Sequence, residues 1–148
     1  IFVIEQAAQM YCRPPQEVKI TAFSTEGGAV VVRAEIDKAQ RRPVKCQEPD
    51  GSWKAFYRVN DENILAPSLM VKAWQRKQSH NAQIITLSEA ETALMRYLDE
   101  EKSLTIEQYA QRAHISMAMA EDIIIRLYAI DIITFTYNGS SFLISKCQ

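Results

Sequence analysis

The sequence predicts an α+β fold in two parts, and three observations carry this prediction. Residues 17–24 alternate apolar and polar side chains with the two-residue period of β-strands, and residues 29–36 form a second β-like run after a turn. Residues 88–130 show apolar stripes at helical spacing, each preceded by a side chain that caps helices. Residues 132–145 form two further β-like runs around Asn138-Gly139, a pair that favours a tight hairpin.

The chain opens with a short predicted helix. Apolar residues recur at helical spacing over residues 1–11, and Pro14-Pro15 end the helix. The apolar pattern begins at Ile1 with no residue to cap the helix. We therefore expect the chain to be a fragment of a longer protein, with further residues upstream.

Two strands joined by a turn follow. Residues 17–24 predict a half-buried strand, and residues 26–28, Glu-Gly-Gly, supply the turn. Residues 29–36 predict a second strand with apolar side chains on both faces. We expect this strand to be central in its sheet and covered on both sides.

A hairpin and a helix complete the first part. Residues 49–52, Pro-Asp-Gly-Ser, form a strong turn signal. Residues 53–59 then predict a strand that carries Lys54 and Arg58 on one face. Pro67 suits the first turn of the next helix.

The boundary between the two parts is predicted from composition. Residues 75–83 are polar and lack hydrophobic periodicity, which indicates a linker. We place one domain at residues 1–79 and another at residues 80–148. Residues 1–80 hold 12 Lys and Arg against 9 Asp and Glu, whereas residues 81–148 hold 5 against 9. Such opposed net charges favour docking of the two domains.

Three capped helices and a hairpin make up the second part. Ser88 and Glu91 form a capping box that opens the first helix. Thr105 with Gln108 caps a shorter helix, and Ser116 caps a third. The Asn-Gly hairpin comes last. The order of helix, helix, turn, helix and hairpin is that of a winged helix-turn-helix domain.

A family resemblance covers residues 1–78. The run VVVRAEIDKAQRRPVKCQEPDGSWKAFYRVNDENILAP has a valine strand, a loop ending in Pro43-Val44, a turn at Gly51 and a strand carrying Arg58-Val59. In this order and spacing it resembles the second half of the Schlafen-type AlbA-like domain. The resemblance implies a partial α/β domain with an antiparallel or mixed sheet, followed by the winged helix-turn-helix domain.

The resemblance also implies a function. Bacterial domains of this type resemble parts of transcriptional regulators and often precede a winged helix. Some eukaryotic relatives cleave RNA with acidic residues, which would lie upstream of Ile1. No catalytic residue is therefore carried over onto this chain.

Basic residues gather on the predicted hairpin, on the loop that enters it and along the next helix. Lys and Arg beside aromatic residues can neutralise phosphates and stack on bases. The residues that we predict to contact nucleic acid are Arg41, Arg42, Lys45, Lys54, Arg58, Lys72, Arg76 and Lys77. Interleaved acids such as Glu48 and Asp61 leave an ordinary solvated charged face as the alternative.

The third helix of the second part is where a helix-turn-helix protein places its DNA-reading residues. The candidate surface of this helix consists of Ser116, Met117, Met119 and Arg126. Acidic residues share its outer side, and the second half of the chain carries net negative charge. We therefore expect this helix not to read DNA directly.

No residue pattern indicates catalysis, a metal or a cofactor. Cys12, Cys46 and Cys147 are widely spaced without a CxxC motif, which predicts three ordinary thiols in a reduced, cytoplasmic compartment. His80 and His114 stand alone in the sequence, so neither is predicted to bind metal. No apolar run approaches the roughly 18 residues that a membrane helix requires.

Three functional hypotheses are consistent with these features. The first is a non-catalytic bacterial protein that binds DNA or regulates transcription, acts as a homodimer and has nucleic acid as its partner. The second is a protein-interaction or dimerisation module built on the acidic winged helix. The third is a fragment of a nucleic-acid-processing enzyme that lacks its catalytic half, so whether the protein is an enzyme stays open.

Overall fold

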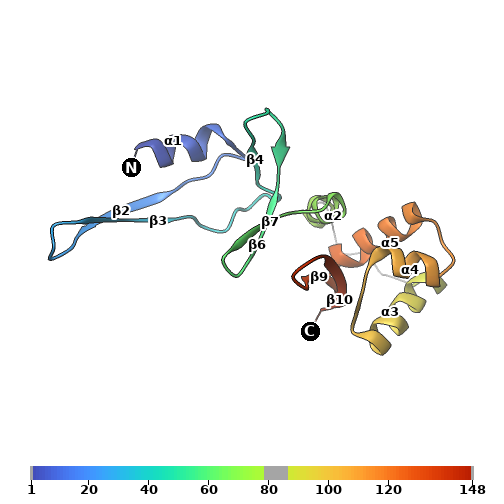
Figure 1. Cartoon of the computed structure of the whole chain (residues 1–148). Helices are drawn as coiled ribbons and strands as arrows, with labels where there is room; N and C mark the ends of the chain where they lie inside the picture. Colours follow the sequence, from blue (N-terminus) through green and yellow to red (C-terminus); the bar gives the residue numbers. More distant parts are fainter. Residues whose placement is uncertain (1, 79–86, 148) are drawn as a thin grey trace. The chain divides into compact units, whose positions relative to one another are not determined.

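The computed structural model describes residues 2–78 and 87–147 (Figure 1). It combines helices with several small antiparallel sheets, which confirms the α+β class. Contacts divide the chain into two units. The first unit comprises residues 1–57 and 63–65, and the second comprises residues 58–62 and 66–148.

The first unit contains one helix and mostly short strands. Its elements are α1 (Phe2–Met10), β1 (Cys12–Arg13), β2 (Lys19–Ser24), β3 (Val30–Glu35), β4 (Lys45–Gln47) and β5 (Trp53–Lys54). Strands β6 (Phe56–Val59) and β7 (Glu62–Leu65) form a two-stranded sheet whose connecting turn belongs to the second unit.

Helix α1 ends where the sequence predicts. Its last residue, Met10, lies four residues before Pro14. The helix buries none of its residues, although its sequence is largely apolar.

Strands β1, β4 and β5 form one antiparallel sheet in the order β1–β4–β5. The predicted turn joins β4 to β5: the Glu48 amide donates to the Ser52 carbonyl over 2.8 Å, and Gly51 has a φ of 81°. A positive φ is what glycine tolerates best. The continuous strand predicted for residues 53–59 is interrupted at Ala55, and β5 and β6 join different sheets.

Strands β2 and β3 form a separate two-stranded antiparallel sheet, from Lys19 opposite Glu35 to Ser24 opposite Val30. The prediction that the second strand is covered on both sides is wrong. Every residue of β3 is exposed, and Val30 keeps 65% of its surface accessible. Within the described residues the sheet has only these two strands, so its apolar side chains lack a covering layer.

The second unit contains four helices and a three-stranded sheet among its described residues. Its elements are α2 (Ser68–Gln78), α3 (Glu89–Glu101), β8 (Ser103–Leu104), α4 (Ile106–Arg112), α5 (Met117–Ala129), β9 (Ile133–Tyr137) and β10 (Phe142–Lys146). The three antiparallel strands are arranged in the order β8–β10–β9.

All three predicted helix caps of the second unit are confirmed. Ser88 and Thr105 cap α3 and α4, each within a complete capping box. The Ser116 hydroxyl accepts from the Met119 amide at the start of α5. Each cap satisfies a backbone N–H that the helix itself leaves without a partner.

The core of the second unit is apolar. The largest apolar side chains that are less than 2% exposed are Tyr109, Met70, Leu94, Leu104, Ile124, Leu127 and Ile133. Strand β8 was not predicted, because two residues are too few to show a periodic pattern. It exists through its pairing with β10, where Leu104 lies opposite Ile144.

The predicted hairpin at Asn138-Gly139 is confirmed as the connection between β9 and β10. Its loop is longer than two residues, because the last strand pair is Tyr137 with Phe142. The Asn138 side-chain oxygen accepts from the amides of Ser140 and Ser141 over 3.0 and 2.9 Å. These bonds shape the turn.

Helix α2 packs against α5 inside the second unit. Met70 and Ala73 are buried, and Lys72 forms an ion pair of 2.7 Å with Glu121. The contacts therefore divide the chain before α2, whereas composition placed the boundary at residues 79 and 80. Residues 75–78 of the predicted linker are helical, and its remainder lies outside the described residues.

Candidate nucleic-acid interface

One face of the β1–β4–β5 sheet joins basic and aromatic side chains. Arg13 lies opposite Lys45, and Gln47 lies opposite Trp53. Directly opposed residues share a face of an antiparallel sheet, and so do residues two apart on one strand. These four residues therefore share one face, which we call the Arg13–Trp53 face. The Arg13 guanidinium lies over the Trp53 ring, 4.2 Å from its centroid.

Local chain geometry produces this face. The Tyr11 amide donates to the Ala7 carbonyl, which continues the hydrogen bonding of α1, and β1 begins at the next residue, Cys12. The Gln47 amide donates to the Tyr11 carbonyl over 2.9 Å, which aligns β4 with β1. The turn after β4 then returns Trp53 to Gln47. Register thus places the indole beside Arg13.

Two more cations precede β4 in the loop after β3. Arg41 and Arg42 are exposed, and Lys45 is half-buried. Among the described residues, none of these three forms an ion pair with a carboxylate. Their charges are therefore available to an anionic ligand, in contrast to those of Lys54, Arg58, Lys72 and Lys77, which form ion pairs.

Lys54 and Arg58 are each paired with a nearby acid. Lys54 lies on the sheet face opposite the Arg13–Trp53 face and forms an ion pair of 3.6 Å with Glu48. Arg58 forms one of 3.6 Å with Asp61, three residues along the chain. Partly exposed pairs of this kind are weak, so they lower local positive charge more than they add stability.

The three basic residues predicted on the helix belong to the second unit. Lys72 pairs with Glu121, Lys77 pairs with Asp131, and Arg76 lies on the same helix. Residues 66–148 hold eight Lys and Arg against nine Asp and Glu. The basic charge of α2 thus compensates acidic charge within its own unit.

Two of the four candidate residues on α5 form contacts that stabilise the fold. Ser116 caps the helix, and Arg126 pairs with the buried carboxylate of Glu91. Met117 and Met119 remain 43% and 49% exposed. Neither methionine carries charge for a phosphate backbone, and α2 packs on this helix. These features favour the expectation that α5 does not read DNA.

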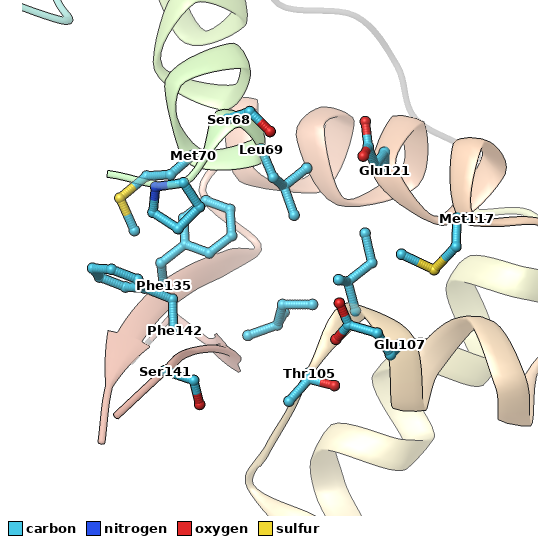
Figure 2. A pocket seen from close by; sticks show the side chains of 13 residues that line it. Ser68, Leu69, Met70, Thr105, Glu107, Met117, Glu121, Phe135, Ser141 and Phe142 are labelled. Atoms are coloured by element: carbon cyan, nitrogen blue, oxygen red, sulfur yellow. The ribbon is translucent and has the colours of Figure 1, made fainter. Parts of the chain in front are cut away.

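A cavity of about 320 Å³ lies beside the start of α5 (Figure 2). Leu69, Phe135 and Phe142 come from three different elements and form apolar walls. Its charged lining side chains are Glu107 and Glu121. Carboxylates repel phosphate, so this cavity suits an apolar group rather than a nucleic acid.

Sequence reasoning missed Arg13 as a candidate. Arg13 lies more than thirty residues before the hairpin, and only the pairing of β1 with β4 brings it to Trp53. The alternation of Arg13 with Cys12 is too short to signal a strand. In the part of the chain that the structure describes, no group of three or more His, Cys, Asp or Glu could hold a metal ion. No helix among those residues is long and apolar enough to cross a membrane.

Comparisons with models of known protein families, with curated proteins and with solved structures found no match.

Proposed function

We propose that the protein is a non-catalytic nucleic-acid-binding protein of the DNA-binding, transcription-regulatory type. Contact is made by the Arg13–Trp53 face together with Arg41 and Arg42. The observation that supports this most is the Arg13 guanidinium over Trp53 with Lys45 on the same face.

Each part of this arrangement matches a property of nucleic acids. Lys and Arg displace condensed counterions from phosphates, which gives affinity that falls with salt. An indole and a guanidinium are flat groups on which the bases of a single strand can stack with little sequence preference. We therefore expect single strands to bind at least as tightly as duplexes.

We further propose that residues 80–148 form a winged helix-turn-helix domain that follows a partial AlbA-like domain at residues 1–79. The order α3–β8–α4–α5–β9–β10 and the sheet order β8–β10–β9 support the winged helix. We assign it no base-reading role, because α2 packs on α5 and the two charged side chains that line the cavity beside Met117 are carboxylates.

Fluorescence anisotropy of the full chain with a labelled single strand and a labelled duplex tests the main proposal. At about 50 mM salt, the double substitution Arg41→Glu/Arg42→Glu and the single substitution Lys45→Glu should each weaken binding about tenfold or more, since charge is reversed at the phosphates. Lys19→Glu is the matched control, because Lys19 is an exposed β2 residue already paired with Asp37. Absence of binding by the intact protein at this salt removes the proposal.

A second candidate function is self-assembly through the second unit. Exposed Met117 lines the apolar cavity, and methionine packs adaptably at protein interfaces. A homodimer through this surface predicts that Met117→Glu shifts the sedimentation coefficient from dimer towards monomer. Met119→Glu should do so much less, since Met119 does not line the cavity. A wild-type chain that stays monomeric at every concentration removes this candidate.

A further inference from the structure

Two of the three cysteines lie side by side. The Cys12 and Cys46 sulfur atoms are 3.9 Å apart, although the residues are 34 positions apart in the sequence. Both side chains are half-buried, whereas Cys147 is exposed at the other end of the chain. The sequence predicted three ordinary thiols, and the pairing of β1 with β4 changes that interpretation.

The register places these thiols where a disulfide fits. Cys12 and Cys46 are direct partners in an antiparallel ladder. The neighbouring pair, Tyr11 and Gln47, is joined by a backbone hydrogen bond of 2.9 Å, so the cysteine pair is a non-hydrogen-bonded one. In such pairs the Cα atoms are about 4.5 Å apart, which falls within the range of about 4.4–6.8 Å found for disulfides.

The surroundings of the two thiols favour oxidation over metal binding. Within the described residues, no third His, Cys, Asp or Glu completes a metal-binding group with the two sulfurs. Burial and the adjoining Cys46 thiol raise the pKa of Cys12. The Cys12 thiol is therefore mostly protonated and reacts through a small thiolate fraction.

We propose that Cys12 and Cys46 are a redox-active dithiol that closes to a reversible intramolecular disulfide. The oxidant is a small-molecule disulfide such as oxidised glutathione. One cysteine thiolate attacks the oxidant, forms a mixed disulfide and releases one reduced thiol. The second cysteine thiolate attacks the mixed disulfide, forms the Cys12–Cys46 bond and releases the second reduced thiol, and the two protein protons pass to solvent and to the released thiolates.

The disulfide would lock the register of β1 against β4. Arg13 and Lys45 each adjoin one of the cysteines along their strands and lie on the opposite face of the sheet. Oxidation therefore holds the Arg13–Trp53 face in its binding arrangement. Binding of nucleic acid should then be tighter, because a face that is ordered before binding loses less conformational entropy on binding. This consequence rests on the proposed function, whereas the disulfide itself does not.

The test uses the full chain equilibrated with oxidised glutathione, then alkylated, digested without reduction and mapped by mass spectrometry. We expect a peptide linking Cys12 to Cys46, a mass lower by two hydrogens, and Cys147 alkylated as in the reduced chain. Reduction with dithiothreitol should restore alkylation of both cysteines. Separate glutathione adducts on Cys12 and Cys46, or disulfides only between chains, would overturn the proposal.

Matched variants separate this outcome from misfolding. Cys147→Ser should still form the link, whereas Cys46→Ser should leave Cys12 as a stable glutathione adduct with an unchanged circular dichroism spectrum. In anisotropy, the oxidised chain should bind a labelled single strand at least threefold more tightly than the reduced chain. If neither form binds the strand, the proposed function is wrong. The peptide map still shows whether the Cys12–Cys46 disulfide forms.

Discussion

Among the residues that the structure describes, Glu91 is the one charged residue that is buried. Its side chain is 1% exposed, and both oxygens of its carboxylate have hydrogen-bond partners. The Ser88 amide and hydroxyl donate to it over 2.7 and 2.8 Å, and Arg126 pairs with its other oxygen. Burial acts to raise the pKa of Glu91, but the bonds from Ser88 and Arg126 together lower it below its usual value.

Removing the charge from Glu91 should therefore destabilise the second unit. Glu91→Gln keeps a side chain that suits a capping box and loses only the charged bonds, so we expect a cost of about 1 kcal/mol. Glu91→Ala also leaves Arg126 and the Ser88 amide without a partner, and should cost about 2–3 kcal/mol. Urea unfolding followed by helical circular dichroism measures both. Equal stability of the three proteins would contradict this account of Glu91.

The same residue predicts a dependence of stability on pH. The folded pKa of Glu91 is lower than the unfolded one, so the unfolded chain binds more protons at acidic pH. The stabilisation is present above the unfolded pKa and is lost as pH falls through the folded pKa. The difference in unfolding free energy between wild type and Glu91→Gln should therefore shrink between about pH 6 and about pH 3. A constant difference over this range would refute it.

At the scale of elements, the packing of α2 on α5 limits how much of α5 is accessible to a partner such as DNA. The contact is apolar at its centre, where Met70 is 1% exposed and Ala73 is fully buried. Ion pairs from Lys72 and Lys77 lie around it, and the Lys77 ammonium also lies 5.4 Å from the Tyr128 ring centroid. Burial of apolar side chains of α2 such as Met70 stabilises the unit more than these half-exposed ion pairs, which add little.

Shortening Met70 should loosen α2 from α5. Met70→Ala creates a cavity in the second unit and should cost about 2–4 kcal/mol of unfolding free energy. Lys72→Ala is the control on the same helix, since its side chain is 52% exposed and its ion pair should contribute less than about 1 kcal/mol. Thermal unfolding of both variants gives the comparison. A larger loss for Lys72→Ala would show that charge rather than burial holds the helix.

Across the whole molecule, the two units differ in how much apolar surface they bury. In the first unit, Ala55 is the only hydrophobic residue that is buried among those the structure describes. The second unit buries aliphatic and aromatic side chains from all of its described helices and from its sheet. An isolated two-stranded hairpin is marginally stable in water, so the β2–β3 hairpin has little stability of its own.

Hydrogen exchange should reveal this difference. Amides of β2 and β3 should exchange at nearly the unprotected rate, with protection below about tenfold. Amides at the centres of α3 and α5 should be protected about a thousandfold or more, as in a domain with about 5 kcal/mol of stability. Mass spectrometry of exchanged peptides measures both regions in one experiment. Strong protection of the hairpin at high protein concentration alone would instead indicate that another copy covers it.

The predictions that hold concern residues close together in the sequence. Ser88 and Glu91, or Asn138 and Ser140, interact over two or three positions, so their types alone indicate a cap or a turn. The prediction that fails concerns whether other parts of the chain cover the two faces of a strand. The valines of β3 form a strand as expected, but alternation indicates only which faces are apolar and not whether anything lies on them.

The amino-acid sequence by itself determined the α+β class, the three helix caps and the two hairpin turns at Gly51 and Gly139, because each rests on hydrogen bonds and backbone preferences within a few residues. Only the tertiary structure decided that Arg13 lies on Trp53, that Cys12 meets Cys46 and that α2 packs on α5. These contacts join residues tens of positions apart. Their formation depends on strand register and on the burial of shared apolar surface, which no short stretch of sequence encodes.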